Sequence, residues 1–335
     1  MSKTLDVLWL QSGGCGGCTM SLLCAESPDL ISTLELGGIR LLWHPALSEA
    51  SGEEVISLLQ RIVDGEVPVD VLCVEGSMLR GPFGSGRFHM FAGSARPMID
   101  WVRDLAQRSR YTLAVGSCAA FGGITAGGSN PADACGLQYD GSHPGGLLGD
   151  AYRSAAGLPV INVAGCPTHP NWVLETLLAL AQSGFDAADL DTLQRPRSFA
   201  DQLVHHGCPR NEYYEYKASA QAPSQLGCLM EHMGCLGTQA HADCNTRLWN
   251  GEGSCVRGGY ACINCTAPEF EEPGHPFTVT PSIAGIPVGL PTDMPKAWFV
   301  ALSSLSKAAT PERLKTNAVS DHARITPKVK STRYR

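Results

Sequence analysis

Cysteine is concentrated in the second half of this chain, where periodic apolar residues are scarce. Seven of the fourteen cysteines lie between positions 208 and 265. Little of this stretch has the apolar spacing of a helix or a strand, so it cannot build much of a hydrophobic core. Cysteines in a reducing compartment favour metal ligation over a disulfide framework. We therefore expect bound metal centres to organise this segment.

Targeting signals are not evident in the sequence. The first fourteen residues contain neither a basic region followed by a long apolar stretch nor a twin-arginine pair, so we expect no export signal. No run of eighteen apolar residues occurs, so no transmembrane helix is expected. The net charge of −7 gives no support to nucleic-acid binding. These features predict a cytoplasmic protein.

Apolar runs alternate with helical patterns in the first half of the chain. Buried strands are predicted at Thr4–Leu10, Ile39–Trp43, Val69–Val74, Tyr111–Val115 and Leu158–Val163. Helical spacing is found at Glu53–Val63, Pro97–Gln107 and Asn171–Gln182. This alternation predicts an α/β domain with a parallel sheet. Ligands of such sheets bind beyond the carboxyl ends of the strands.

The character of the chain changes near residue 185 and again after Pro268. Residues up to about Pro295 are rich in Pro and Gly, and a short apolar stretch follows at Ala297–Leu305. From Lys307 to Arg335 eight basic residues face only two acidic ones, so this tail carries about +6 and is expected to be poorly ordered alone. We predict three segments, 1–190, 191–275 and 276–335.

The first group of candidate ligands follows the predicted strands. Cys15-Gly-Gly-Cys18 comes after the first strand, Cys118 after a later one and Cys166 after the last. A lone CxxC motif fits zinc, a thioredoxin-like pair or an iron–sulfur ligand. Four thiolates at one sheet edge suit a [4Fe–4S] cluster. A tetrahedral zinc ion would accept the same four thiolates, so it remains an alternative.

Two further groups lie in the cysteine-rich segment. The first contains His205, Cys208, Cys228 and Cys235, with His206 as the neighbouring candidate; we prefer His205 for its HxxC spacing. The second contains Cys244, Cys255, Cys262 and Cys265. A zinc ribbon is the alternative for this second group, but it usually needs paired CxxC knuckles.

Three cysteines remain outside these groups. Cys24 is expected on a helix and Cys73 in a buried strand, both as small core residues. Cys135 lies in a Gly-rich stretch and could be either a ligand or a structural residue; we favour an ordinary loop cysteine.

Several of these motifs together resemble the small subunits of nickel–iron hydrogenases. The run from Leu8 to Cys18, LWLQSGGCGGC, is similar to the opening of that family. Gly116-Ser117-Cys118-Ala119, Gly165-Cys166-Pro167, His205-xx-Cys208-Pro209-Arg210 and Cys262-xx-Cys265 follow in the family's order. The resemblance covers roughly residues 5–270, and agreement of several independent motifs makes chance an unsatisfactory explanation.

The resemblance implies a flavodoxin-like domain without flavin, followed by a small iron–sulfur domain. It implies a proximal [4Fe–4S] cluster on Cys15, Cys18, Cys118 and Cys166, and a distal [4Fe–4S] cluster on His205, Cys208, Cys228 and Cys235. It also implies a medial cluster on Cys244, Cys255, Cys262 and Cys265. Glu75 matches an acidic position near the proximal cluster, or else makes only a local hydrogen bond at the end of a strand.

The sequence departs from the common family pattern in three places. Many members hold a three-iron [3Fe–4S] medial cluster with a proline where Cys255 stands, so a fourth thiolate here implies a third [4Fe–4S] cluster. Six residues separate Cys228 from Cys235, one more than the family pattern leads us to expect. We expect neither the export signal nor the membrane anchor of respiratory members, because no such pattern occurs in this sequence. These departures and the GGCGGCTMSLL opening are most similar to the cytoplasmic, H2-sensing (regulatory) branch.

The resemblance also implies partners and a reaction. H2 would be split at a nickel–iron centre in a partner large subunit, and this chain would transfer the electrons one at a time. The alternatives are the small subunit of a cytosolic uptake hydrogenase and, less well supported, a quinone-reductase subunit of the complex I type. The basic tail is expected to bind an acidic surface, either a second heterodimer or a histidine kinase.

Overall fold

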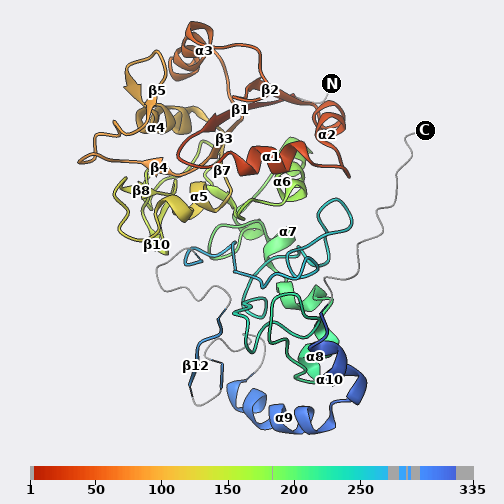
Figure 1. The fold of residues 1–335 in the computed structure, drawn as a ribbon. Helices are drawn as coiled ribbons and strands as arrows, with labels where there is room; N and C mark the ends of the chain where they lie inside the picture. The colour runs from red at the N-terminus through yellow and green to blue at the C-terminus, as the bar shows by residue number, and fades with distance from the viewer. Residues whose placement is uncertain (1–3, 183, 271–278, 284–285, 288–294, 322–335) are drawn as a thin grey trace. The chain divides into compact units, whose positions relative to one another are not determined.

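A computed structural model describes residues 4–182, 184–270, 279–283, 286–287 and 295–321 (Figure 1). The chain forms two compact units that interleave along the sequence. The first unit comprises Met1–Gln202, His241–Glu252 and Asn264–His275. The second comprises Leu203–Ala240, Gly253–Ile263 and Pro276–Arg335. Each unit is described by itself.

A five-stranded parallel sheet forms the centre of the first unit. Its strands are β1 (Leu5–Gln11), β2 (Ile39–Trp43), β3 (Val71–Glu75), β7 (Tyr111–Val115) and β11 (Ile161–Val163). Their order is β11-β7-β3-β1-β2, and all neighbours are parallel. This is the order of flavodoxin-like folds. The predicted α/β fold class is therefore confirmed.

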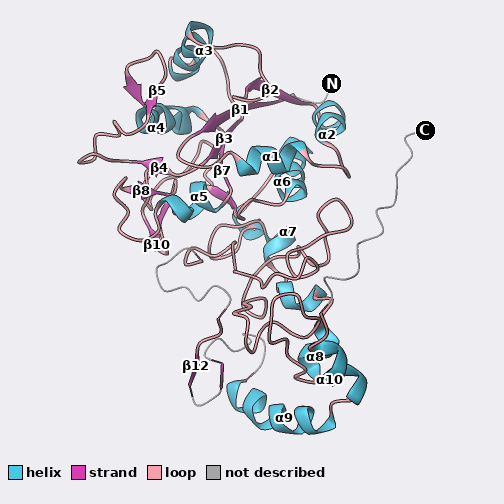
Figure 2. Cartoon of the chain, viewed as in Figure 1, coloured by secondary structure: helices cyan, strands magenta, loops and turns pink. Residues whose placement is uncertain are grey.

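Helices cover both faces of this sheet (Figures 1 and 2). On one face α3 (Glu53–Val63) and α4 (Met98–Arg108) share a core with the strand residues Leu8, Leu72 and Val74. On the other face α1 (Gly17–Leu23) and α2 (Leu30–Gly37) each pack against α6 (Pro170–Gln182). Cover on both faces explains why the strands are continuous apolar runs rather than alternating patterns.

The predicted strands differ from the observed ones mainly at their ends. Two of the five, Ile39–Trp43 and Tyr111–Val115, have the predicted bounds. The last strand begins at Ile161 instead of Leu158. Pro159 explains this difference, because proline has no N–H to donate to a neighbouring strand.

Short elements complete the first unit. Antiparallel pairs are formed by β4 (Met78–Leu79) with β8 (Ala134–Cys135), β5 (Met90–Phe91) with β6 (Arg96–Pro97), and β9 (Tyr139–Asp140) with β10 (His143–Pro144). Short helices are α5 (Ser117–Phe121), η1 (Gly123–Thr125), η2 (Ala187–Asp189) and α7 (Arg197–Ala200).

Two of the three cysteines outside the ligand groups were placed wrongly from the sequence. Cys135 is not an ordinary loop residue, because it is fully buried in β8 opposite Met78. Cys24 is exposed at the end of α1, whereas Cys73 is buried in β3 as expected. The buried residues of α1 are Thr19, Ser21 and Leu22. Cys24 is the C-cap of this helix and does not belong to its buried face.

The second unit has little regular structure and only small apolar clusters. Its elements are η3 (Val204–Gly207), α8 (Asn211–Glu215), β12 (Ser282–Ile283), β13 (Ile286–Pro287), α9 (Lys296–Ala309) and α10 (Glu312–Ala318). One cluster joins Tyr214, Met230 and Phe299, and another joins Ala218, Leu314 and Ala318. The small size of these clusters agrees with the expectation that this region lacks a large hydrophobic core.

The first part of the basic tail is folded in contact with the rest of the second unit, whereas its charge led us to expect poor order for the tail alone. Lys307 forms an ion pair with Glu231, and Arg313 pairs with Glu212 at 2.6 Å. The Thr310 hydroxyl donates a hydrogen bond to the carbonyl of Tyr216 at 2.7 Å. The prediction considered charge alone, whereas helices α9 and α10 also bury apolar side chains. The tail after residue 321 lies outside the described residues.

Candidate metal centres

Three of the predicted proximal ligands follow the carboxyl ends of parallel strands. Cys18 lies in α1 after β1, Cys118 lies in α5 after β7, and Cys166 follows β11. Because parallel strands end at the same edge of a sheet, these three thiols gather there. Cys118 and Cys166 lie close enough to Cys18 to contribute to the rise in the pKa of its thiol, which burial causes in the main. Cys15 lies at the same strand end and is exposed, with its Sγ accepting a hydrogen bond from the Gly17 N–H at 3.3 Å.

Glu75 fixes the backbone that carries Cys18. It is the last residue of β3 and is 3% exposed. One carboxylate oxygen accepts hydrogen bonds from the N–H groups of Cys18 and Thr19, each at 3.0 Å. The other accepts from the Thr19 hydroxyl and from the Gln11 amide. Gly16, the N-cap of α1, has no side chain, so Glu75 caps this helix from a neighbouring strand.

The backbone of Gly116 passes so close to Cys18 that no side chain fits between them. Gly116 has a φ of 85°, and a Cβ built on it would lie 2.4 Å from the Cys18 Sγ. The glycine between β7 and Cys118 therefore allows the backbone to pass the sulfur closely. Burial raises the pKa of the Cys18 thiol, and the carboxylate of Glu75 raises it further. A cationic iron centre would favour the thiolate instead, because metal ligation displaces the thiol proton.

The predicted distal ligands all lie in the second unit. The thiols of Cys208, Cys228 and Cys235 interact electrostatically with one another. Burial raises the pKa of Cys228 to about 12. The ring of His205 lies edge-on against Tyr214, with centroids 4.2 Å apart. His206, the alternative ligand, has its ring 6.5 Å from that of His205.

A buried arginine accompanies these three thiols. Arg210 is 8% exposed and donates hydrogen bonds to the carbonyls of Gln225 and Gly227, each at 2.6 Å. A third hydrogen bond runs from its Nε to the Val256 carbonyl at 3.3 Å. The leading electrostatic interactions of the guanidinium are with the thiols of Cys208, Cys228 and Cys235. Among the described residues, no carboxylate forms an ion pair with it.

This arginine provides a test of whether the residues fit an anionic cluster. A buried cation is costly unless an opposite charge compensates it. Neutral thiols and backbone carbonyls supply no full negative charge, whereas thiolates bound to an iron–sulfur cluster would do so. The donor set and its counter-charge therefore fit a cluster better than a purely structural group of cysteines.

The predicted medial ligands are divided between the two units. Cys244 and Cys265 belong to the first unit, and Cys255 and Cys262 to the second. In the second unit the Cys262 N–H donates to the Cys235 Sγ at 3.4 Å, and the charge of Cys255 acts on Cys235. In the first unit the Ser117 hydroxyl donates to the carbonyl of Cys265. No group of three or more His, Cys, Asp or Glu in the described parts of the chain is arranged to hold a single metal ion.

Sequence reasoning missed Arg210 as a part of the site. Arg210 is part of the His205-xx-Cys208-Pro209-Arg210 motif, but the motif alone predicted no role for it. The only feature of the sequence that pointed to Arg210 was its position two residues after the proposed ligand Cys208. Burial of its guanidinium depends on the loops that contain residues 225–227 and 256, which are far away in the sequence.

Two family models match successive parts of the chain. The model described as NADH ubiquinone oxidoreductase, 20 Kd subunit, matches residues 15–180. The model for the C-terminal part of the NiFe/NiFeSe hydrogenase small subunit matches residues 200–278. The first domain alone would fit either a hydrogenase small subunit or a quinone-reductase subunit. The second match favours the hydrogenase small subunit.

Similar proteins support the same assignment. The F420 non-reducing hydrogenase I small subunit of Methanosarcina mazei is 32% identical over 310 residues, which span 84% of this chain and 77% of the relative. The chain belongs to the nickel–iron hydrogenase small-subunit family. The periplasmic [NiFeSe] hydrogenase small subunit of Desulfomicrobium baculatum is 31% identical over 298 residues, or 83% of this chain and 88% of the relative.

Solved hydrogenases share the fold of this small subunit. The actinobacterial-type NiFe-hydrogenase from Ralstonia eutropha H16 aligns with a TM-score of 0.74 and 28% identity, over 99% of this chain and 96% of its own. The reduced Ni-Fe-Se hydrogenase of Desulfomicrobium baculatum aligns with a TM-score of 0.69 and 31% identity, over 80% and 96%. None of the helices described for this hydrogenase subunit is both long and apolar enough to cross a membrane.

Proposed function

We propose that this chain is the electron-transfer subunit of an H2-oxidising heterodimer, with three [4Fe–4S] clusters. The observation that carries the proposal is the gathering of Cys18, Cys118 and Cys166 at one sheet edge. Iron–sulfur clusters, when bound, supply one-electron carriers. Cys15, Cys18, Cys118 and Cys166 would hold the proximal cluster, and His205, Cys208, Cys228 and Cys235 the distal one. Cys244, Cys255, Cys262 and Cys265 would hold the medial cluster.

The predicted division into 1–190, 191–275 and 276–335 follows this assignment of ligands. The first segment carries the proximal ligands, the second carries the others, and the third carries no ligand. Helices α9 and α10 of the third segment would instead serve contacts with partners.

A large subunit that contains the nickel–iron centre is the proposed partner of the proximal edge. Cys15 is exposed there, and Met20 and Leu23 expose 67% and 49% of their surface. Leu22, the third apolar residue of this stretch, is 3% exposed and belongs to the core. Exposed apolar side chains beside a proposed ligand fit a large, obligate type of interface.

Copurification tests this partnership directly. A tagged small subunit expressed with its large subunit should retain nickel through gel filtration. Replacing both Met20 and Leu23 by Asp should release the partner, whereas the exposed control Leu36→Asp, on α2, should not. Nickel that stays bound to the Met20→Asp/Leu23→Asp variant would remove the interface claim.

We further propose a regulatory H2 sensor in the cytoplasm, assembled as a dimer of heterodimers. Trp298, Leu302 and Leu305 lie on α9 at spacings of four and three residues and expose 67%, 46% and 68% of their surface. Such spacing places them on one side of the helix. This apolar face supports contact with a second copy. A histidine kinase is the proposed receiver of the H2 signal, as the resemblance to the sensing branch implies.

Assembly and physiology test the sensor proposal separately. Replacing Trp298 and Leu305 by Ser should halve the mass of the complex in light scattering, while H2-dependent dye reduction remains. Disrupting the gene should abolish H2-dependent transcription but leave H2 uptake intact. Loss of H2 uptake with normal transcription would favour the second candidate, a cytosolic uptake hydrogenase.

A further inference from the structure

An aromatic cluster lies against the proposed distal ligands in the second unit. Its buried members are Tyr214, Met230 and Phe299. The side chains of Cys228 and Cys235 pack against this cluster. The ring of Tyr214 also meets the ring of His205, with centroids 4.2 Å apart and planes at 66°. The cluster therefore contacts three of the four proposed distal ligands, although its buried members are not ligands themselves.

Helix α9 supplies one of these buried side chains. Phe299 is 6% exposed and packs in the cluster, whereas its neighbour Trp298 exposes 67% of its surface. The ring centroids of Phe299 and Tyr214 are 6.5 Å apart, a separation at which aromatic rings attract each other. A helix of the C-terminal segment, which carries no proposed ligand, therefore takes part in the surroundings of the distal site.

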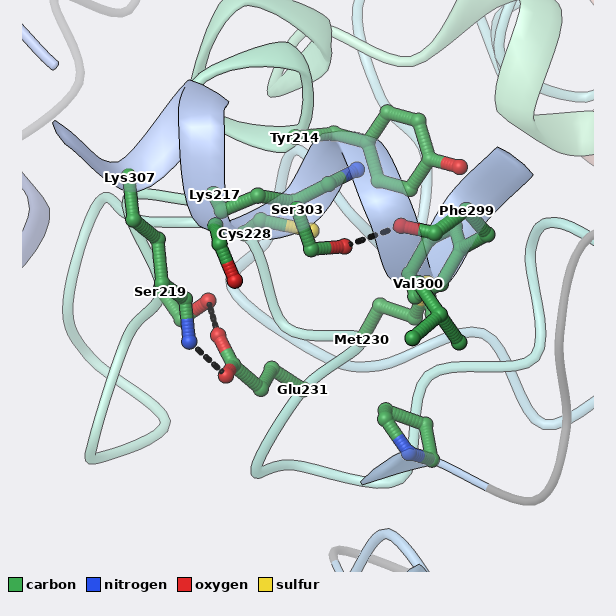
Figure 3. A pocket seen from close by; sticks show the side chains of 12 residues that line it. Tyr214, Lys217, Ser219, Cys228, Met230, Glu231, Phe299, Val300, Ser303 and Lys307 are labelled. Atoms are coloured by element: carbon green, nitrogen blue, oxygen red, sulfur yellow. Dashed lines mark hydrogen bonds and ion pairs between the residues drawn. The ribbon is translucent and has the colours of Figure 1, made fainter. Parts of the chain in front are cut away.

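The side chain of Lys217 joins the two rings (Figure 3). Its ammonium lies 3.7 Å from the ring centroid of Tyr214 and 4.5 Å from that of Phe299. Burial lowers the pKa of this ammonium, whereas the thiol of Cys228 and two nearby carboxylates raise it. The charge of Lys217 is thus balanced within the chain, and its contacts with the rings fix them relative to each other.

The backbone of Lys217 has a conformation that lysine rarely adopts. Its φ is 52°, in the left-handed region, and its N–H donates a hydrogen bond to the carbonyl of Tyr214 at 3.1 Å. Lys217 follows Tyr216, the C-cap of α8, at a position where glycine is usual because it has no Cβ. A lysine at this position indicates that its side-chain contacts outweigh the cost of the backbone conformation.

The orientation of a histidine ligand depends on its surroundings. The torsion between Cβ and the imidazole ring is intrinsically broad, and groups that fix a ligating histidine affect the metal site that it holds. We propose that Tyr214 is the positioning residue for the ring of His205. Lys217 and Phe299 in turn hold Tyr214 in place, so helix α9 helps to set the geometry of the distal site. The inference rests on the proposed function as far as His205 is taken as a distal ligand.

Electron–nuclear double resonance on the anaerobic heterodimer, reduced with dithionite, tests the proposal. Histidine labelled with ¹⁵N identifies the nitrogen bound to the distal cluster, and the width of its lines reports how uniformly the ring is oriented. Tyr214→Leu should widen these lines about twofold, because several ring orientations become accessible. Tyr214→Phe retains the ring and should give lines of the natural width.

Further variants separate positioning from folding. Lys217→Gly suits the left-handed backbone, so the chain should fold while the lines still widen. Phe299→Leu removes the ring from the buried side of α9 and should widen the lines as well. Trp298→Leu removes the neighbouring, exposed ring and is the matched control, for which the natural width is expected. Natural line width in Tyr214→Leu or in Lys217→Gly, or equal widening in Trp298→Leu, would overturn the proposal.

The proposed function is tested separately by H2-dependent reduction of methyl viologen. Absence of this reaction, with ¹⁵N lines that widen in Tyr214→Leu, would refute the hydrogenase role and still support the positioning of His205. Normal reduction of viologen without any ¹⁵N coupling to a cluster would overturn the positioning of His205 and leave the hydrogenase role intact.

Discussion

The carboxylate of Glu75 accepts hydrogen bonds from the backbone N–H groups of Cys18 and Thr19, each at 3.0 Å. A strand and a helix that are separated by more than fifty residues are thereby joined at the proposed proximal ligand. Helix α1 has no side-chain N-cap of its own, so this carboxylate replaces one.

Replacing Glu75 by Gln should loosen helix α1. A lost cap costs about 1–2 kcal/mol, so hydrogen exchange of the Cys18 and Thr19 amides should become about tenfold faster. Mass spectrometry of peptides from this helix measures the effect. Glu66→Gln, which removes an exposed ion pair with Arg61, should leave the exchange unchanged. Equal protection in Glu75→Gln would show that the cap is dispensable.

Much of the proximal edge was predictable because parallel strands end together. Once the strands near Cys18, Cys118 and Cys166 were recognised, their shared edge followed from chain direction alone. Glu75 was predicted as an acidic neighbour of the cluster or as a local hydrogen-bond acceptor. The observed hydrogen bonds fix the backbone of Cys18, a proposed proximal ligand, so they are compatible with both interpretations.

Other features of the fold depend on contacts between residues far apart in the sequence, which a local pattern cannot predict. Helix α1 buries Thr19 and Ser21 and exposes Met20, which reverses the usual amphipathic pattern. The reversal is possible because Thr19 donates to Glu75, and Ser21 donates to the carbonyl of Thr168 at 2.7 Å. Helices α9 and α10 likewise form ion pairs with Glu231 and Glu212, which lie far earlier in the chain.

His169 should make the first unit less stable in acid. Its ring is buried between Trp172 and Trp249, with centroid distances of 5.3 and 4.8 Å. Burial lowers the pKa of His169 from 6.5 to about 4. The folded state therefore binds fewer protons than the unfolded state in this range, and stability falls as the pH drops from 6.5 to about 4. The expected loss is about 1.4 kcal/mol per pH unit.

Urea unfolding followed by tryptophan fluorescence measures this dependence. The natural chain and His169→Gln differ in their free energy of unfolding. This difference should shrink by about 1.4 kcal/mol per pH unit as the pH falls from 6.5 to about 4. His143→Gln, a change at an exposed position of β10, is the control and should show no such trend. A constant difference between the natural chain and His169→Gln would mean that His169 does not titrate with folding.

Arg210 should raise the reduction potential of the proposed distal cluster. Reduction adds negative charge, and a buried guanidinium among three ligand thiols stabilises that charge. Arg210→Met should therefore lower the potential by on the order of 50 mV. An EPR-monitored redox titration of the iron-loaded complex measures the shift. Arg197→Met, at an exposed ion pair with Asp201 in the other unit, should leave the potential unchanged.

The same titration can contradict the proposed role of Arg210. If the reduction potential of folded Arg210→Met protein is unchanged or raised, the guanidinium does not tune the cluster. Its role would then be limited to the hydrogen bonds that it donates to backbone carbonyls. Arg210→Lys retains the charge without the planar set of donors, so most of the potential should be preserved while stability falls.

Mössbauer spectroscopy of the anaerobic complex tests the central claim most directly, namely that this chain holds three four-iron clusters. The account predicts about twelve iron atoms in the small subunit, all in [4Fe–4S] form, with Cys255 as the twelfth ligand. Cys255→Pro should remove about one iron atom and produce a [3Fe–4S] signal. A three-iron signal in the intact natural protein, or iron sufficient for only one cluster, would contradict the account.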